Sequence, residues 1–504
     1  METNLLLSDL IKGLGTRVNI ISPFGSEPYE PDPEIIGVTS NSKEVHAGFL
    51  FAALLGSNFD GSQFISEAIA RGAVAILINA SSDVFSKPMI VHTISTDNPR
   101  RLFALISAKL HGKQPDFIAA VTGTNGKTSV VEFTRQLWIM NGINSASLGT
   151  LGVVANNLEL QSELTSPDPV SLHTNLNALS QSGVTNLAIE ASSHGLDQSR
   201  LDGVSIQSAA FTNLSQDHLD YHVDEASYFL SKARLFSELL AETGVAVLNA
   251  DSPYFSELRH ICTGRKISIS SYGYSTHATM RVLNITPYLS GQHVELEVNG
   301  VIFEIHLSLI GEFQLFNVLA ALGLVSAEEG SEVINYLENL DKIKGVPGRL
   351  EHIGTHPTGA PIVVDYAHTP DALKNILVSL RPHVKGKLVC VFGAGGDRDK
   401  EKRPFMGKVA SVLADITIVT DDNPRSESPM VIREEIMKGC PLAQNVGGRS
   451  EAISLGLSNL SDGDLLVIAG KGHETRQEIA GTTIPFNDAA FVQTQLNEVV
   501  GGVQ

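Results

Sequence analysis

Cysteine and positive charge are both scarce in this sequence. Its cysteines, Cys262, Cys390 and Cys440, are few, odd in number and far apart, which excludes a disulfide framework and a cysteine-based metal site. Lys and Arg number 36 against 55 Asp and Glu, which gives a formal net charge of −19. The chain therefore lacks the basic face that a general nucleic-acid binder needs. An anionic ligand would have to be held by a few local cations and backbone N–H groups.

Long apolar runs are also missing. No stretch approaches the roughly 18 apolar residues of a transmembrane helix. The first residues, METNLLLSDLIKGL, lack the basic start of a signal peptide. We therefore expect a soluble protein of the cytoplasm with no membrane span. Because 42% of the residues are hydrophobic and 18% are charged, the chain can bury several cores and is neither disordered nor fibrous.

Short apolar runs alternate with helical patterns along most of the chain, which is typical of parallel α/β sheets. Strands are expected at residues 73–78, 117–121, 187–189, 245–248, 362–364, 388–392, 416–419 and 465–468. Helices are expected at residues 99–110, 127–140, 226–241, 315–326, 370–378 and 449–458. Between residues 267 and 309 the apolar residues follow a period of two, which predicts an antiparallel patch beside the central sheet.

Two junctions have the composition of linkers, at residues 111–115 (HGKQP) and 344–349 (KGVPGR). At roughly 100 to 200 residues per domain, the chain is expected to divide there into three domains, 1–112, 113–344 and 345–504. The predicted fold class is α/β, with a central parallel-sheet domain that carries a phosphate loop and a C-terminal Rossmann-like domain.

A glycine-rich loop, GTNGKT, follows the apolar strand FIAAV and opens a helix. In this context glycines let backbone N–H groups approach phosphate oxygens, and the helix N-terminus favours negative charge. The strict pattern of such loops fails, because Val121 stands where its first glycine should be. The alternative is a tight strand–helix turn that binds nothing. We predict an ATP site formed by Gly123, Thr124, Asn125, Gly126, Lys127, Thr128 and Ser129.

At this point the chain resembles the Mur ligase superfamily, in which GTNGKT after a strand is the usual phosphate loop. The resemblance covers nearly the whole chain through a collinear series of motifs: TSNSKEVHAGFLF, GTNGKT, LTSPDP, EASSHGLDQSR, FTNLSQDHLDYH, the helix around Lys232, VPGRLE, DYAHTPDAL, FGAGGDRDKEKRP, DDNPRSE and GKGHE. It implies an N-terminal UDP-binding domain, a central ATPase domain and a C-terminal amino-acid-binding domain. It also implies ATP and Mg²⁺ as cofactors, and we expect a monomer.

Four side chains are candidates for the catalytic metal site. Glu190 ends an apolar strand, where a carboxylate faces the ligand crevice of a parallel sheet, although it could instead cap a turn. The resemblance implies that Glu190 binds Mg²⁺ together with Thr128, and that His218, in the polar cluster at 217–222, binds a second Mg²⁺. It also implies that Lys232 is carbamylated and holds metal near the transferred phosphate. From the residues alone, Lys232 would be a solvated helix lysine.

By resemblance, a second set of residues contacts a UDP-muramoyl dipeptide. A polar loop without that role remains the alternative for several of them. The set consists of Ser42, Ser57, Asn58 and Phe59 in the first domain and Thr165, Ser166, Ser192, Gln198 and Arg200 in the second. The resemblance further implies that Asn317, Arg349 and Asp365 hold ATP. Gln314 departs from the usual asparagine of the family, and Asn317 could also be a helix-surface amide.

The tetrapeptide Asp-Asn-Pro-Arg occurs twice. At residues 97–100 it precedes a helical pattern, so an Asp or Asn cap and a first-turn proline are expected. The copy at 422–425 follows the strand DITIVT and matches the diaminopimelate motif of the family. Arginines can clamp carboxylates with two bonds, and Glu474 can accept an ammonium. The predicted amino-acid site contains Arg398, Asp422, Asn423, Pro424, Arg425, Gly470 and Glu474.

The expected activity is ATP-dependent addition of meso-2,6-diaminopimelate to UDP-MurNAc-L-Ala-D-Glu through an acyl phosphate. Positioning and charge neutralisation carry most of such a step, with Lys127, Glu190, His218 and Lys232 as the catalytic set. Three alternatives stay open. They are the same ligation with L-lysine, a folylpolyglutamate synthetase-like ligase, and a nucleotide-dependent ATPase or switch without ligase chemistry.

Overall fold

The computed structural model describes residues 5–23, 31–56, 59–82, 90–155, 158–160, 165–215, 221–328 and 330–501. The chain forms two compact units, one of Met1–Ser271 with Ala320–Glu332 and one of Tyr272–Leu319 with Val333–Gln504. The three-domain division at 112/113 and 344/345 stays a prediction. Within the described residues, no helix has the length and apolar character needed to cross a bilayer.

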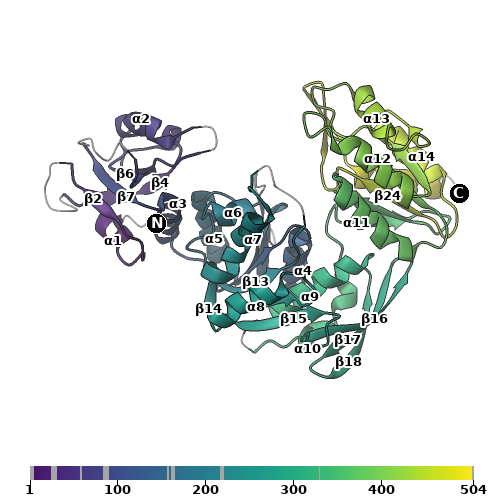
Figure 1. Ribbon diagram of the computed structural model, residues 1–504, viewed down its shortest axis with the longest axis horizontal. Coiled ribbons are helices and arrows are strands. Elements are labelled where there is room, and N and C mark those ends of the chain that lie inside the picture. The colour runs from purple at the N-terminus through teal and green to yellow at the C-terminus, as the bar shows by residue number, and fades with distance from the viewer. Residues whose placement is uncertain are drawn as a thin grey trace. The chain divides into compact units, whose positions relative to one another are not determined.

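The first unit begins with a small sheet of order β2-β7-β6-β5-β4 (Figure 1). Its pairs are parallel except β2 with β7. Helix α3 (Pro99–His111) starts as its tetrapeptide predicts, because the Asn98 side chain accepts the N–H of Arg101 and Pro99 takes the first position. The remaining elements are β1 (Leu5–Leu6), α1 (Leu7–Ile11), β2 (Asn19–Ile21), β3 (Glu34–Ile35), β4 (Gly37–Thr39), β5 (Phe49–Ala52), α2 (Ile65–Ala70), β6 (Ala75–Asn79) and β7 (His92–Thr96).

The second sheet of this unit has the order β11-β10-β9-β12-β8-β13-β14 and continues into β15. Strands β9, β12, β8, β13 and β14 run parallel, so their carboxyl ends lie along one edge. The bounds are β8 (Phe117–Thr122), β9 (Ser145–Gly149), β10 (Gly152–Ala155), β11 (Leu158–Leu160), β12 (Asn186–Glu190), β13 (Ile206–Phe211), β14 (Leu240–Asn249) and β15 (Ser268–Gly273). Strand β11 pairs antiparallel with β10 and forms one end of this sheet.

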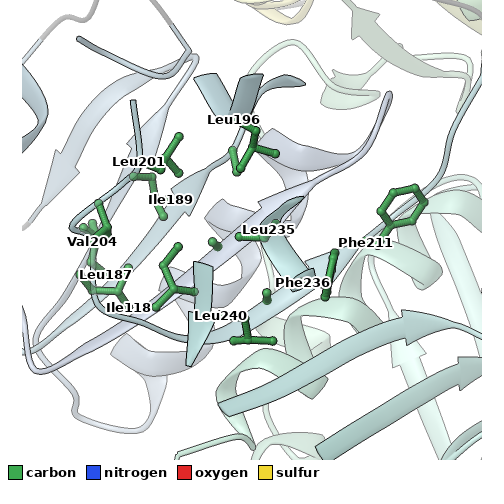
Figure 2. Close-up of a cluster of buried hydrophobic side chains, with 14 of the residues drawn as sticks. Ile118, Leu187, Ile189, Leu196, Leu201, Val204, Phe211, Leu235, Phe236 and Leu240 are labelled. Atoms are coloured by element: carbon green, nitrogen blue, oxygen red, sulfur yellow. The ribbon is translucent and has the colours of Figure 1, made fainter. Parts of the chain in front are cut away.

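The core of this sheet explains one wrong helix end. The helix expected to run to residue 241 stops as α7 (Glu225–Arg234), passes through a π-helical turn (Leu235–Leu239) and becomes strand β14. Leu235, Phe236 and Leu240 are fully buried, and Leu240 pairs with Ile206 of β13. Pairing in the sheet therefore overrides the helical propensity of the run. Figure 2 shows these side chains with their neighbours from β8, β12 and β13.

Five helices of the described residues pack beside this sheet, and of these the sequence predicts only α4 and α7, with starts at residues 127 and 226. Asp168 caps α5 by accepting two backbone N–H groups, with Pro169 at the first position. Asp224 and Ser227 form a reciprocal capping box that starts α7. The helices are α4 (Lys127–Met140), α5 (Pro169–Gln181), α6 (Ser193–Asp197), α7 (Glu225–Arg234) and α8 (Phe255–Gly264).

The second unit contains the predicted antiparallel patch, in which β17 pairs with both β16 and β18. It also contains a sheet of order β19-β20-β24-β21-β22-β23, parallel except β19 with β20. This is the doubly wound pattern expected of a Rossmann-like domain. The strands are β16 (Met280–Tyr288), β17 (Gly291–Val298), β18 (Val301–Leu307), β19 (Glu351–Thr355), β20 (Pro361–Asp365), β21 (Leu388–Phe392), β22 (Ile416–Val419), β23 (Gln444–Asn445), β24 (Leu465–Ala469), β25 (Arg476–Ile479) and β26 (Thr482–Pro485).

Thr369 caps α11 and is followed by Pro370, so the predicted helix start at 370 is confirmed. The helices of this part of the chain are α9 (Glu312–Val325), α10 (Ile334–Leu337), α11 (Pro370–Leu380), α12 (Lys402–Leu413), α13 (Pro429–Met437), α14 (Arg449–Ser458) and α15 (Asp488–Gly501). Because β20, β24, β21 and β22 are parallel neighbours, the segments after them meet at one edge, which gathers the predicted ligand residues of this unit.

Candidate active site

The phosphate loop links β8 to the start of α4. Gly123 and Gly126 have φ values of 146° and 88°, which residues with a Cβ rarely adopt. The Lys127 ammonium folds back over the loop and donates to the carbonyl oxygens of Gly123 and Thr124, both at 2.9 Å. Thr128 lies in the first turn of α4 and is buried, as is Ser129. The predicted loop is therefore a compact turn around its own lysine, at the positive end of a helix.

Lys232 is buried rather than solvated. Its side chain is 1% exposed, its Nζ donates to the carbonyl oxygen of Gly123 at 2.7 Å, and it lies 4.5 Å from the centre of the Tyr228 ring. The solvated-lysine alternative is therefore wrong. The ammonium groups of Lys127 and Lys232 therefore donate to the same carbonyl oxygen of the phosphate loop, that of Gly123.

Glu190 ends β12 and pairs in register with Val121 at the end of the loop strand β8. Its carboxylate accepts hydrogen bonds from the backbone N–H of Thr150 at 2.8 Å and from the Thr150 hydroxyl at 3.2 Å. A side chain at Gly149 would collide with it, since a Cβ there would lie 2.3 Å from Oε1. The carboxylate is thus bonded to Thr150 in the turn that follows β9, while Ser192 and not Glu190 caps the helix α6 that follows β12.

The second-domain residues predicted for the UDP-muramoyl dipeptide form one hydrogen-bonded network. The Ser192 hydroxyl donates to the Ser166 hydroxyl at 3.0 Å and caps α6. Arg200 donates to the Ser166 carbonyl at 2.8 Å and to Gln198 Oε1 at 2.7 Å, and burial lowers the pKa of its guanidinium. Thr165 joins through Thr150, hydroxyl to hydroxyl at 3.2 Å, which connects the network to Glu190.

The first-domain candidates are only partly described. Ser42 is buried and donates to Glu67 Oε2 at 2.9 Å. Phe59 is 68% exposed and meets the edge of Phe64, so a flat apolar surface is open to a ligand. Three of the predicted residues lie outside the described residues: Ser57, Asn58 and His218.

The predicted ATP residues of the second unit form a chain of contacts. Asn317 donates to Gln314 Oε1 at 3.0 Å, and Gln314 donates to the Arg349 carbonyl at 2.9 Å. Both amides are buried, so Asn317 is not a helix-surface amide. Arg349 lies over the ring of Tyr366, at 5.0 Å from its centre.

Asp365 ends β20 and accepts the backbone N–H groups of Leu350 at 2.8 Å and Ala367 at 2.7 Å. Burial raises the pKa of its carboxyl, while the Arg349 charge and these two hydrogen bonds oppose that rise. The carboxylate therefore fixes the turn that follows Arg349. Gly470 N–H donates to the Asp365 carbonyl, which places the end of β24 beside it.

The second copy of the tetrapeptide has a closely bonded centre. Asn423 donates to Glu474 Oε2 at 2.8 Å, and a side chain at Gly470 would lie 2.5 Å from Asp422 Oδ2. Lys471 was not among the predicted residues. Its fully buried ammonium donates to Asn423 Oδ1 at 3.1 Å and to Glu474 at 2.9 Å. The signal was its place inside the GKGHE motif.

The two arginines predicted to grip carboxylates border the same glycine. A Cβ at Gly395 would lie 3.0 Å from Arg425 Nη1 and 3.9 Å from Arg398 Cγ. Arg425 donates to the Gly396 carbonyl at 2.8 Å, and its Nε lies 3.5 Å from Glu478 Oε2. Pro424 presents its carbonyl to Gly396, where a Cβ would lie 1.9 Å away. The Arg425 guanidinium and the Arg398 side chain thus lie beside one turn, and Glu474 accepts from Asn423 of that turn.

Known proteins resemble this chain over nearly its whole length. Three family models match: the Mur ligase family catalytic domain at residues 34–107, the Mur ligase middle domain at 121–325, and the Mur ligase glutamate ligase domain at 348–472. A UDP-N-acetylmuramoyl-L-alanyl-D-glutamate–2,6-diaminopimelate ligase of Chelativorans sp. (strain BNC1) is 47% identical over 96% of this chain and 99% of its own. The chain belongs to the Mur ligase family.

Further relatives of this Mur ligase carry the same name. The Caulobacter vibrioides protein is 45% identical over 93% of this chain and 97% of its own. A solved structure of a UDP-N-acetylmuramoyl-L-alanyl-D-glutamate–2,6-diaminopimelate ligase is 30% identical, with a TM-score of 0.72, and the match covers 99% of this chain and 100% of the other. The predicted α/β, three-domain Mur ligase architecture is confirmed.

The residues of this Mur ligase fit ATP with Mg²⁺. A Cβ at Gly123 would lie 1.9 Å from the Thr212 hydroxyl, so only glycine fits this position of the loop. Among the residues that the structure describes, no three His, Cys, Asp or Glu side chains gather as a metal site. Mg²⁺ commonly takes one or two carboxylates and completes its shell with substrate phosphates and water. Glu190 fits that role, because each carboxylate oxygen has two lone pairs and Thr150 occupies one on each.

Proposed function

We propose that this Mur ligase joins meso-2,6-diaminopimelate to UDP-MurNAc-L-Ala-D-Glu, with ATP converted to ADP and phosphate. The observation that carries the proposal is the cluster of Arg398, Arg425 and Glu474 around one turn, in a chain that is 47% identical to a ligase of that name. The reaction belongs to peptidoglycan precursor synthesis, and we place it in the cytoplasm, with the protein acting as a monomer.

The proposed reaction has two steps, phosphorylation of a carboxylate and transfer of its acyl group to an amine. A carboxylate oxygen of the D-glutamyl residue attacks the γ-phosphorus of ATP, and the bond to the bridging oxygen breaks to release ADP. An amine of diaminopimelate then attacks the acyl carbon, phosphate leaves with the electrons of the C–O bond, and the nitrogen loses a proton. Little covalent work falls to the protein, so positioning and charge stabilisation supply the catalysis.

Lys127 and the start of α4 stabilise the phosphoryl oxygens, since both place positive charge at the loop. The loop backbone from Gly123 to Gly126 approaches the phosphates, and Thr128 and Glu190 would hold Mg²⁺, which lowers the negative charge of the transferred group. His218 is proposed as a ligand of a second Mg²⁺.

Lys232 is proposed to be carbamylated. The modification would turn one of the two cations at the Gly123 carbonyl into an anion that can bind metal, while its Nζ–H could still donate. The buried position beside the phosphate loop supports this role.

The substrates are assigned to the networks already described. The UDP-muramoyl dipeptide is held by Ser166, Ser192, Gln198 and Arg200 with Thr165, and by Ser42, Ser57, Asn58 and Phe59 of the first domain. ATP is further held by Asn317, Arg349 and Asp365. The amino acid is held by the 422–425 turn with Arg398, Gly470 and Glu474. Arginines at the distal end favour a second carboxylate on the amino acid, which diaminopimelate has and L-lysine lacks.

One assay separates the alternatives. Phosphate release is measured with UDP-MurNAc-L-Ala-D-Glu and ATP in the presence of meso-diaminopimelate, L-lysine or L-ornithine, and with either substrate omitted. We expect release only when both the dipeptide substrate and diaminopimelate are present. Release with L-lysine but not diaminopimelate would favour the lysine enzyme, and release without an amino acid would favour an ATPase or switch. A parallel reaction with a folate and L-glutamate in place of these substrates tests the folylpolyglutamate alternative, which release there would favour.

A further inference from the structure

The phosphate loop is held by a second segment of chain, residues 212–215 (Thr-Asn-Leu-Ser), here called the loop strap. It follows β13, which pairs in parallel with the loop strand β8, so the two carboxyl ends lie side by side. The Thr124 N–H donates to the Asn213 carbonyl at 2.9 Å. The Ser215 N–H donates to the Thr124 hydroxyl at 3.0 Å, and that hydroxyl lies 3.3 Å from the Ser215 carbonyl. The strap therefore contacts the loop through its backbone as well as its side chains.

The strap binds both backbone polar groups of one loop residue, Asn125. The Asn125 N–H donates to Asn213 Oδ1 at 3.0 Å. The Asn125 carbonyl accepts from Asn213 Nδ2 at 3.1 Å and from the Thr212 hydroxyl at 2.6 Å. Only a side-chain amide offers a donor and an acceptor together in this way. Asn213 thus fixes Asn125, which precedes Gly126, the N-cap residue of α4.

The strap also explains why residue 123 is a glycine. A Cβ at Gly123 would lie 1.9 Å from the Thr212 hydroxyl and 3.1 Å from the backbone N of Asn213. The strap occupies the space that a side chain would need. Val121 replaces the first glycine of the longer pattern and lies within β8, so the loop begins only at Gly123. The strap supports that loop from another strand.

We propose that Asn213 is a positioning residue for ATP, acting through Asn125. By fixing this residue before the nucleotide arrives, it orients the N-terminus of α4, where backbone N–H groups favour phosphate oxygens. A preorganised site avoids the ordering cost of binding. This inference rests on the assignment of the loop as the ATP site and adds a residue to it.

The test is Asn213→Asp, with Asn144→Asp as the matched control. Aspartate keeps the acceptor at residue 213 but loses the donor and sets a negative oxygen against the Asn125 carbonyl. Asn144 donates to the Gly183 carbonyl at 2.8 Å. Asn144 precedes β9 and Gly183 precedes β12, so this bond lies at the amino ends of the strands, whereas the phosphate loop lies at their carboxyl ends. The same substitution there removes a comparable side-chain bond far from the loop.

We expect Asn213→Asp to raise the KM for ATP and the Kd for a fluorescent ADP analogue about tenfold or more. The KM values for the UDP-muramoyl dipeptide and for diaminopimelate should change less than about twofold. Asn144→Asp should leave all four constants unchanged. If Asn213→Asp does not fold, the near-isosteric Thr212→Val removes one of the three bonds to residue 125 and should move the ATP and ADP constants in the same direction.

An unchanged Kd for the ADP analogue in folded Asn213→Asp would overturn the inference, and so would equal losses in the KM of all three substrates or the same effect from Asn144→Asp. The ADP titration needs no second substrate. It therefore tests Asn213 even if the wild-type protein fails to release phosphate in response to diaminopimelate, which would refute the proposed function separately.

Discussion

Arg425→Lys is the sharpest test of the amino-acid site. Arg425 has a φ of 53°, and lysine carries the same Cβ, so the substitution adds no new backbone strain. Its guanidinium uses one N–H on the Gly396 carbonyl and directs another toward Glu478, out of five donors. The rest of the fork can grip a substrate carboxylate with two parallel bonds, a geometry that a lysine ammonium cannot reproduce.

The magnitude follows from the bond that is lost. A hydrogen bond to a charged group contributes about 1.5–3 kcal/mol, and each 1.4 kcal/mol corresponds to roughly a factor of ten in an equilibrium constant. Arg425→Lys should therefore raise the KM for meso-diaminopimelate about 10- to 150-fold. The KM values for ATP and for UDP-MurNAc-L-Ala-D-Glu should change little. Initial rates of phosphate release, with one substrate varied at a time, measure all three constants.

The first copy of the tetrapeptide provides the control. Arg100 lies in the first turn of α3 and donates to the Leu55 carbonyl, in the other unit of the chain. Burial lowers the pKa of the Arg200 guanidinium, and the charge of Arg100 lowers it further. Arg100→Lys keeps that charge and should not change the KM for diaminopimelate. If Arg100→Lys weakens diaminopimelate use and Arg425→Lys does not, the wrong copy has been assigned. If neither matters, the selectivity argument fails and L-lysine becomes the better substrate.

Three further predictions concern single side chains. Lys127→Ala should lower turnover roughly 10²–10³-fold while the protein stays folded, and near-normal turnover would contradict the phosphate-loop assignment. Lys232→Ala should abolish activity that high bicarbonate with a short-chain acid restores in part, and density beyond the Lys232 Nζ in a crystal would show the carbamate directly. Burial lowers the pKa of His173 to about 4, so the unfolded state binds more protons between pH 6.5 and 4. The unfolding free energy should therefore fall by up to about 3 kcal/mol across that range, and His173→Gln should weaken this dependence in thermal unfolding measured against pH.

Most of the secondary structure and the phosphate loop could be predicted from the sequence, because local rules control them. Helix α4 runs from Lys127 to Met140 as its pattern predicts, and strand β21 runs from Leu388 to Phe392. Apolar periodicity depends only on neighbouring residues. The predicted helix from 226 failed only at its end, where pairing of Leu240 with Ile206 ends the helical geometry.

Candidate residues that follow strand ends could also be identified from the sequence, since a parallel sheet gathers those ends at one edge. Glu190, Asp365 and the 422–425 turn all follow strands. The roles proposed for Lys232 and His218 rest on the family resemblance, because a lysine or histidine in a polar pattern has many ordinary uses.

Contacts between distant segments were decided only by the tertiary structure. Nothing near Lys232 in the sequence predicts that its ammonium reaches the Gly123 carbonyl, and nothing near Asn213 predicts that it grips Asn125. Lys471 likewise becomes a partner of Asn423 only when β22 and β24 are brought to one sheet. Periodicity and capping act over a few residues, whereas these bonds form across separations of 48 to 109 residues, where only the packing of the sheets sets which side chains meet.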